Sequence, residues 1–153
     1  MSRVETSSRA LAEPPGRFRL DGELAVMEHF AGPLLVMARA LLAYVFIVEG
    51  YGKIVAYHDV AAYMTQYGVT PVVLPAVILT ELGGGLLILI GLKTRWAAIA
   101  LGGFCLLTAW LFHFGPEEAI QFEKNVAIAG GFVALATTGA GPWSVDAGLR
   151  LFR

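Results

Sequence analysis

The residues best suited to chemistry in this sequence are ionisable side chains that interrupt long apolar stretches. Six of them form a candidate ligand-binding site: Arg39, Glu49, Lys53, Glu81, His113 and Lys124. A charge inside a lipid bilayer is costly, so such groups need an internal partner or a water-filled cavity. Buried charges of this kind either serve a ligand or proton site or form a salt-bridge network that only holds helices together.

The two carboxylates carry most of this prediction. The lysines, the histidine and Arg39 have side chains that could extend toward a membrane surface from their places in the sequence. A purely structural role is therefore as good a reading for these basic residues as a functional one. Glu49 and Glu81 are short and cannot reach far, so they point more strongly to an internal site.

The elements that must position these residues are long apolar segments. The chain has 153 residues, of which 57% are hydrophobic and 15% are charged, whereas soluble domains carry about a quarter charged residues. A helix needs roughly 20 apolar residues to cross a bilayer core. Four segments have this length, at about 33–53, 71–91, 95–114 and 122–140. The sequence predicts an all-α integral membrane protein, a bundle of four transmembrane helices.

Helical geometry brings the charges of the first span onto one face. At about 100° per residue, Arg39 and Lys53 lie within roughly 40° of each other, and Glu49 lies about 40° further round. Glu49 and Lys53 are four residues apart, in the favourable order for an ion pair within one helix. Glu81 lies near the middle of the second span, and a pair with Lys53 or Arg39 would satisfy both charges even in a purely structural role. All of the candidate residues except Arg39 should converge in the outer half of the bundle.

Charges in the short links and flanking segments predict the orientation. Basic residues collect in the link between the second and third spans, with Lys93 and Arg95, and in the tail at 148–153. Because basic residues favour cytoplasmic loops, both termini should lie in the cytoplasm. Residues 1–32 are polar; we expect 1–20 to be mostly disordered and 22–32 to form a short interfacial segment. The bundle domain itself should cover 33–147.

Several other classes of function are disfavoured. The net charge of −1 argues against nucleic-acid binding. The three histidines are scattered, so we expect no metal site. Cys105 is the only cysteine, so no disulfide or paired-cysteine redox motif can form within one chain. Glycine pairs inside the spans, such as Gly84-Gly85 and Gly130-Gly131, indicate close helix packing in lipid.

The order of these features resembles the DoxX family of bacterial four-helix membrane proteins. The motifs that carry the resemblance are RALLAYVFIVEGYGKI (39–54), YGVTP (67–71), ELGGGLLILIGLKTRWAA (81–98), EKNVAIAGG (123–131) and GAGPWSVD (139–146). Together they cover about residues 33–147. Glu49 departs from the pattern, because a small or apolar residue is expected at this position.

The resemblance implies a location and a class of function. It places the chain in the bacterial cytoplasmic (inner) membrane, as a subunit or accessory protein of a respiratory or thiol-linked oxidoreductase system. A quinone is then a sensible non-covalent ligand, because the buried carboxylate and its basic partners could supply hydrogen bonds and a proton at the carbonyls. No covalently bound cofactor is expected, and the resemblance does not decide whether the chain is itself catalytic.

Two other classes stay open at this point. A small-molecule transporter or permease would use the internal charges to hold its substrate. A non-catalytic scaffold for a partner complex would use them only as a salt-bridge network. The expected partners are membrane lipid, a protein of a membrane complex and a second copy of the chain in a homo-oligomer.

Overall fold

The computed structural model describes residues 15–151, and every regular element within this range is a helix. The α-helices are α1 (Pro15–Val55), α2 (Tyr57–Gln66), α3 (Leu74–Ile90), α4 (Thr94–Phe112), α5 (Ala119–Thr138) and α6 (Val145–Leu151). Two short 3-10 turns, η1 (Pro71–Val73) and η2 (Pro116–Glu118), precede α3 and α5. The all-α prediction is confirmed.

Three of these helices are long and apolar enough to cross a membrane. The segments are His29–Val55 in α1, Pro71–Ile90 formed by η1 and α3, and Thr94–Phe112 in α4. They agree with the first three predicted spans, which confirms an all-α membrane protein. With its 20 residues, α5 has the length of a span, but its first turns carry Glu123, Lys124 and Asn125. Its crossing of the membrane and the cytoplasmic placement of both termini stay predictions.

The chain divides into two units with a boundary between Ala31 and Gly32, so the helical residues of each are considered separately. Residues 15–31 are helical, and this differs from the disorder expected up to residue 20. One feature of the sequence favours a helix here. Pro15 suits a first helical turn, because its fixed φ is helical and its missing N–H has no partner there in any case. The other residues of the expected disordered segment, 1–14, lie outside the described range.

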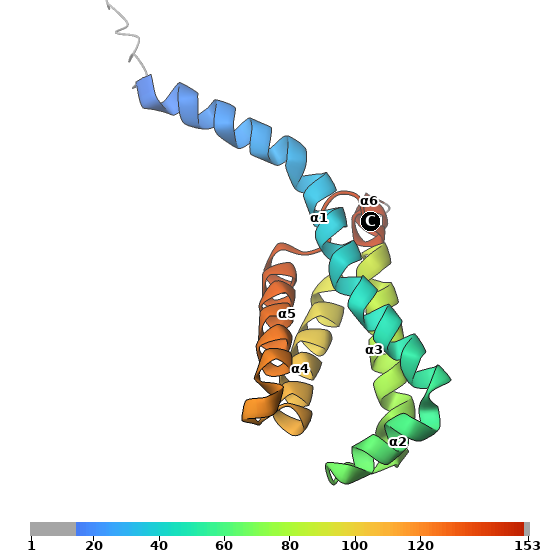
Figure 1. Cartoon of the computed structure of the whole chain (residues 1–153). Coiled ribbons are helices and arrows are strands. Elements are labelled where there is room, and N and C mark those ends of the chain that lie inside the picture. Colours follow the sequence, from blue (N-terminus) through green and yellow to red (C-terminus); the bar gives the residue numbers. More distant parts are fainter. Residues whose placement is uncertain (1–14, 152–153) are drawn as a thin grey trace, which may run out of the picture. The chain divides into compact units, whose positions relative to one another are not determined.

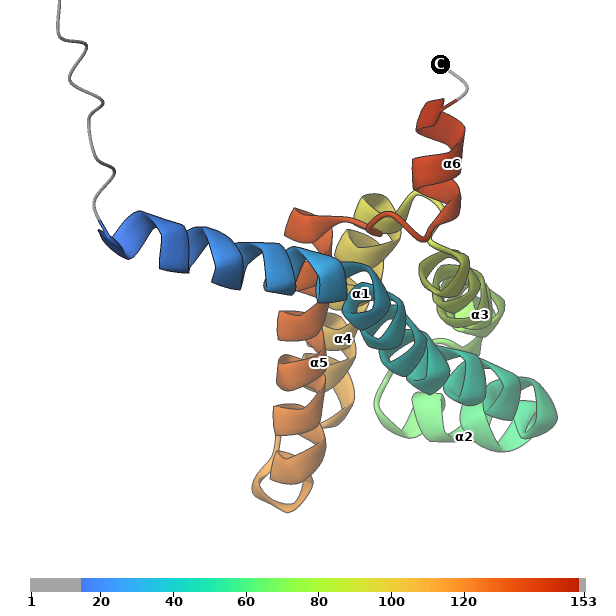
Figure 2. The same cartoon turned by 90° about the horizontal axis from the view of Figure 1, so that it is seen from above.

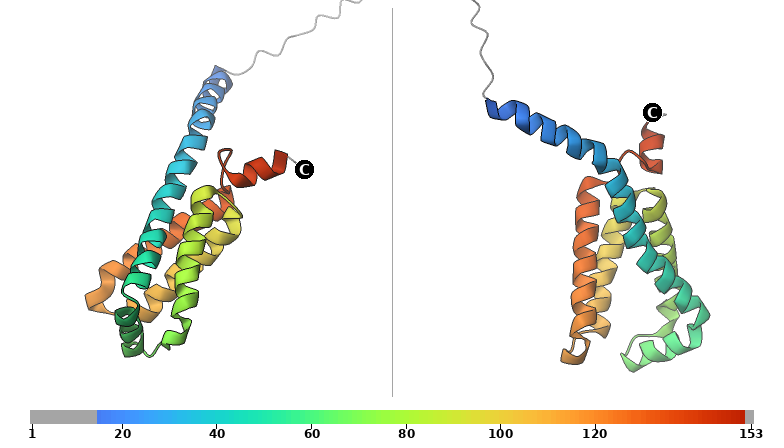
Figure 3. Two further views of the ribbon diagram at one scale, coloured as in Figure 1. Left: turned by 90° about the vertical axis from the view of Figure 1, so that its right-hand side faces the viewer. Right: turned by 45° about the horizontal axis from the view of Figure 1, so that its top comes forward.

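In the second unit, α4 and α5 run side by side, α3 packs against α4, and the 32–55 part of α1 crosses α3 (Figure 1). Figure 3 shows the same neighbours from two further directions. A cluster of buried residues joins α1, α3, α4 and α5, and includes Phe46, Ile88, Leu101 and Phe132. We call the end that holds α2, η1 and η2 the α2 end, and the opposite end, with the α3–α4 turn and α6, the α6 end.

Glycines set the close crossing of α1 and α3, as expected for helices packed in lipid. A Cβ added at Gly50 would lie 2.8 Å from Leu82 Cγ and 3.1 Å from the Leu82 backbone nitrogen. A Cβ at Gly85 would lie 3.0 Å from Ile47 Cγ1. The close approach brings the charged residues of α1 within reach of Glu81. Other glycines inside the helices, including Gly103 and Gly130, face open space.

The links contain two helices that the sequence pattern did not reveal. Residues 54–70 were expected to be a link, yet α2 occupies most of them and η1 follows at Pro71. At the other end, α6 begins at Val145, beside the α3–α4 turn, because the Asp146 N–H donates to Gly91 O at 2.9 Å. Figure 2, viewed from above, shows α6 extending from this end while α3 is seen almost along its axis.

Candidate functional site

The α2 end of the bundle contains a cavity of about 850 Å³. Its wall is mostly apolar and is built from α1, α2, α3, α4 and α5. Five of the six candidate residues line it: Glu49, Lys53, Glu81, His113 and Lys124. The structure therefore brings together the residues that were expected to converge, although their part in binding a ligand stays a prediction.

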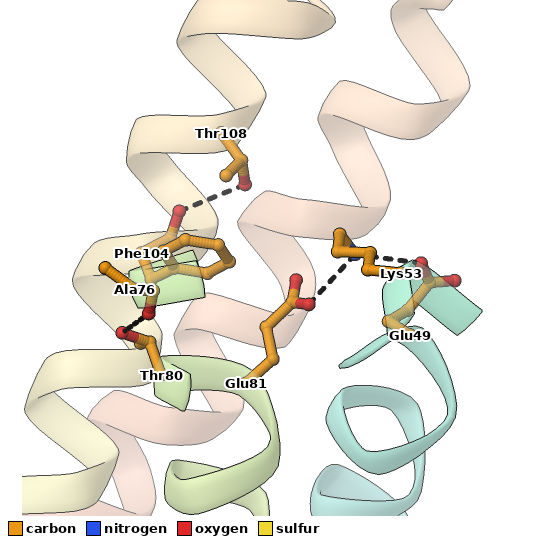
Figure 4. A network of polar contacts seen from close by, with 7 residues as sticks. All are labelled: Glu49, Lys53, Ala76, Thr80, Glu81, Phe104 and Thr108. Carbon is orange, nitrogen blue, oxygen red and sulfur yellow. Dashed lines mark hydrogen bonds and ion pairs between the residues drawn. The ribbon is translucent and has the colours of Figure 1, made fainter. Parts of the chain in front are cut away.

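The centre of the site is an ion pair between α1 and α3. Lys53 Nζ lies 2.9 Å from Glu81 Oε2 and 3.3 Å from Glu49 Oε2. Figure 4 shows Lys53 between the two carboxylates. The Glu81 side chain is 6% exposed, whereas that of Glu49 is 64% exposed. The predicted pair within α1 is confirmed, and Lys53 rather than Arg39 is the basic partner of Glu81.

Hydroxyl and amide groups in the cavity wall are largely satisfied by their own helices. The Thr108 hydroxyl donates to Phe104 O at 3.0 Å, and Asn125 Nδ2 donates to Gln121 O at 3.0 Å. No hydrogen-bond or ion-pair partner of Lys124 lies among the described residues. The two lysine ammonium groups are thus the strongest donors that the wall can offer to a ligand.

Aromatic rings of a predicted link and a predicted span end lie at one edge of the cavity. The Tyr63 ring of α2 stacks on Phe112 of α4 with centroids 5.8 Å apart, and Tyr67 lies 4.8 Å from Tyr63. Next to them, His113 Nδ1 lies 3.1 Å from Glu118 Oε2. The aromatic residues of 57–67 could have suggested a helix here, but their contact with α4 has no local signal in the sequence.

Tyr63 stays in its neutral form at ordinary pH. Burial, followed by the hydrogen bond and charge interaction with Tyr67, raises the pKa of Tyr63 to about 12. The negative charge of Glu118 acts in the same direction. The Tyr63 hydroxyl at the edge of the cavity is therefore a hydrogen-bonding group and not an acid.

Arg39 does not line this cavity, although it was a candidate for the same site. It lies at the α6 end, is 2% exposed, and donates from Nη2 to Trp143 O at 2.6 Å. Gly91 stands so close to the guanidinium that an added Cβ would overlap Arg39 Nη1. Arg39 is on the predicted inner part of α1, but its observed contact holds the segment before α6, not the cavity at the α2 end.

Asp146 is a structural residue that the candidate set lacked. Its Oδ1 accepts from the Lys93 N–H at 2.7 Å, and its Oδ2 accepts from the Thr94 N–H at 3.0 Å. This carboxylate caps the first turn of α4, where backbone N–H groups have no partner within the helix. The closing GAGPWSVD motif was the available signal, because it contains the aspartate that makes these bonds.

Groups that could hold a metal are absent from the described part of the chain: no three His, Cys, Asp or Glu side chains are close enough together. Cys105 is buried in the cavity wall, and the structure gives it no second thiol within the chain. The polar side chains of the cavity wall, among them Lys53, Glu81 and Lys124, offer hydrogen bonding, charge stabilisation and proton exchange.

Comparison with known proteins places this architecture in a family. The DoxX family model matches residues 34–114. The inner membrane protein YqjF of Escherichia coli (strain K12) is 47% identical over 115 residues, covering 73% of this chain and 88% of the relative. The inner membrane protein YphA of the same strain is 35% identical over 124 residues, covering 74% and 88%.

No solved structure matches the chain at the level of similarity that identified these relatives. The two relatives confirm the predicted location in the bacterial cytoplasmic (inner) membrane, and their names carry no activity. The family match covers the helices that carry Arg39, Glu49, Lys53, Glu81 and His113, and stops before α5. The chain belongs to the DoxX family of membrane proteins.

Proposed function

We propose that the protein is a membrane subunit or accessory protein of a respiratory or thiol-linked oxidoreductase system, and that its cavity binds the head group of a quinone. One observation carries the proposal: the buried Lys53–Glu81 ion pair lies in the wall of a mainly apolar cavity of about 850 Å³. A pure packing pair would be enclosed by side chains on all sides.

The cavity suits a quinone in size and character. Ligand pockets usually measure about 300–1,000 Å³ and are lined by apolar side chains with a few polar groups. Here Val77, Phe104 and Ile128 belong to the apolar part, and Lys53 and Glu81 to the polar part. A bound quinone supplies two-electron chemistry, in which it takes up two electrons and two protons to become the quinol.

The residues of this chain would bind and orient the head group. The Lys53 ammonium has three N–H donors; it donates to Glu49 and forms an ion pair with Glu81. A donor that Glu49 does not occupy can serve a carbonyl oxygen in the cavity, and the two carboxylates hold the ammonium in place. Glu81 contacts the ammonium that would bind this oxygen. Its carboxylate is therefore the candidate group for holding a proton near the quinone.

Electrons have to come from a partner protein. Among the described residues, no cluster of metal-ligating side chains and no pair of cysteines offers a redox centre. The proposal therefore assigns quinone binding to this chain and electron transfer to a membrane partner. It makes no statement that the chain is catalytic by itself.

The test is binding of a short-tailed ubiquinone analogue to the purified protein in lipid nanodiscs, followed by quenching of tryptophan fluorescence. Because a hydrogen bond to a charged group contributes about 1.5–3 kcal/mol, Lys53→Gln and Glu81→Gln should each weaken binding about tenfold or more. Glu117→Gln makes the same chemical change at an exposed residue outside the cavity wall and should leave binding unchanged.

Two results would contradict the proposal. The first is that the wild-type protein shows no saturable quinone binding. The second is that Glu81→Gln binds the quinone as well as the wild type does. In that case the transporter and scaffold classes remain, and substrate-dependent flux in liposomes would separate them.

A further inference from the structure

A second cleft, of about 540 Å³, lies at the α6 end and is separate from the cavity described above. It is lined by the first turn of α4, with Lys93, Arg95 and Trp96, and by the segment after α5, with Ala140 and Gly141. None of these residues has a part in the proposed quinone site. The cleft therefore needs its own explanation.

Two cationic side chains stand in the wall of this cleft. Arg95 donates from Nη1 to Ala136 O at 3.0 Å, which leaves the other guanidinium donors for a further acceptor. For the Lys93 ammonium, no acceptor or ion-pair partner lies among the described residues. Asp146 is the acidic residue of the wall, and its two carboxylate oxygens already accept the Lys93 and Thr94 N–H groups.

Two backbone N–H groups in the wall of the cleft also lack an acceptor. The N–H groups of Ala140 and Gly141 make no hydrogen bond to any described residue, although Ala140 is only 6% exposed. Buried backbone N–H groups are nearly always paired, so a group left without an acceptor needs an explanation. Gly139 and Gly141 have positive φ angles of +79° and +77°, a conformation that glycine adopts without steric cost.

The cleft also has the surroundings of a membrane interface. The Trp96 ring lines it and is 75% exposed, and the nearby Trp143 is 64% exposed. Tryptophan is enriched at the level of lipid headgroups. The cleft lies where α3 ends at Ile90 and α4 begins at Thr94, at the ends of two membrane spans. Basic pockets in this position are suited to anionic lipid headgroups.

We propose that this cleft binds the phosphate of an anionic phospholipid headgroup. Lys93 and Arg95 pair with the phosphate oxygens, and the Ala140 and Gly141 N–H groups provide additional donors. Free inorganic phosphate has the same chemistry, but the exposed Trp96 ring and the ends of two apolar spans favour a ligand that is anchored in the membrane. The site needs no quinone and no partner enzyme, so it is independent of the proposed function.

Native mass spectrometry of the protein in detergent, titrated with phosphatidylglycerol or phosphatidylcholine, tests this proposal. A basic residue near an anionic surface contributes about 1 kcal/mol, or about fivefold in affinity. The wild type should therefore prefer phosphatidylglycerol, and Lys93→Gln with Arg95→Gln should lower its affinity about 25-fold. Lys124→Gln removes one charge at the α2 end and should not change this preference.

A further variant separates binding from folding. Lys93 is the one non-glycine residue of the described chain with positive φ, at +47°. Lys93→Gly relaxes this backbone strain, so the protein should melt at a higher temperature and still bind phosphatidylglycerol about fivefold more weakly. Equal binding by the wild type and the charge-removing variants would overturn the proposal. Release of the lipid by millimolar inorganic phosphate would overturn the lipid as ligand and leave the free ion instead.

Discussion

At the α6 end, Asp146 accepts two backbone N–H groups, whereas at the α2 end Glu81 pairs with Lys53 beside a large cavity. Both carboxylates belong to motifs of the same family, and Glu81 has its ion-pair partner, Lys53, on α1. The local geometry separates their roles. Asp146 connects the start of α4 to the segment that leads into α6. Glu81 connects α1 to α3 with one ion pair and leaves space on its other side.

The two carboxylates differ in how closely the residues around them pack. At the α6 end, Gly91 approaches the Arg39 guanidinium and Ser144, with no room for a side chain. At the α2 end, Gly52 in the cavity wall has no atom within 4 Å of an added Cβ. Close packing at a helix crossing holds the helices in register. A hollow region with a buried charge is where a ligand can displace solvent.

The largest expected effect comes from placing a side chain at Gly91. Gly91 has φ of +71°, a conformation that is strained for a β-branched residue. A Cβ there would overlap Arg39 Nη1 and lie 2.6 Å from Ser144 Cβ. We expect Gly91→Val to lower the free energy of unfolding by about 3 kcal/mol or more, measured by titration with a denaturing detergent.

Gly103→Val is the matched control for this prediction. Gly103 is a helical residue with open space around its Cβ position, and valine has a better helix propensity than glycine. The control should fold at least as well as the wild type. Equal stability of the Gly91 and Gly103 variants would show that Gly91 is not closely packed against Arg39 and Ser144.

An effect of intermediate size is expected when a larger side chain is placed in the buried core and, for comparison, in the cavity wall. The change in stability should differ between the two positions. Leu101→Phe inserts a ring into the buried cluster, where Leu101 is 0% exposed, and overpacking of this kind costs about 1–3 kcal/mol. Val77→Phe adds more volume, but Val77 lines the cavity, so its stability should stay within about 0.5 kcal/mol of the wild type. It should nevertheless weaken quinone binding.

Thermal unfolding and the quinone titration check this pair together. If Val77→Phe destabilised the protein as much as Leu101→Phe, the cavity would be occupied by protein side chains in the folded state. The comparison between a filled and a hollow region would then fail, even if quinone bound elsewhere.

The sequence predicted the spans well, because the length of an apolar segment is by itself enough to indicate a membrane-spanning helix. The first three predicted segments differ from the observed ones by a few residues, and the Glu49–Lys53 pair follows from spacing within one helix. The i,i+4 relation needs no tertiary information. The convergence of Lys53, Glu81, His113 and Lys124 was also predictable, since a span fixes the depth of its residues.

The partner of each buried charge was not predictable in this way. Glu81 had two basic candidates on one face of α1, and only the crossing at Gly50 and Gly85 shows that Lys53 is the partner. Arg39 contacts the Trp143 carbonyl, a backbone group 104 residues away, and a carbonyl oxygen has no signature in sequence. Likewise, α2 is a short helix whose apolar residues pack on α4, so its stability comes from tertiary contacts rather than from its own pattern.

The smallest expected effect is a change in stability that involves the aromatic residues at the edge of the cavity. It appears only at high pH. Burial and the contact with Tyr67 raise the pKa of Tyr63 from 10.0 to about 12. Between these values the unfolded chain loses the Tyr63 proton and the folded protein keeps it. The stability of the wild type must therefore fall as the pH rises from about 10 to about 12.

Melting temperatures of the wild type and Tyr63→Phe, recorded from pH 8 to pH 12, test this. The difference between the two proteins should be constant up to about pH 10 and then shift in favour of Tyr63→Phe, because the phenylalanine has no proton to lose. Tyr51→Phe removes a phenol hydroxyl away from this edge of the cavity and controls for that loss. A difference that stays constant up to pH 12 would mean that Tyr63 is as accessible in the folded protein as in the unfolded chain. The aromatic rings at the edge of the cavity would then not shield the Tyr63 hydroxyl from water.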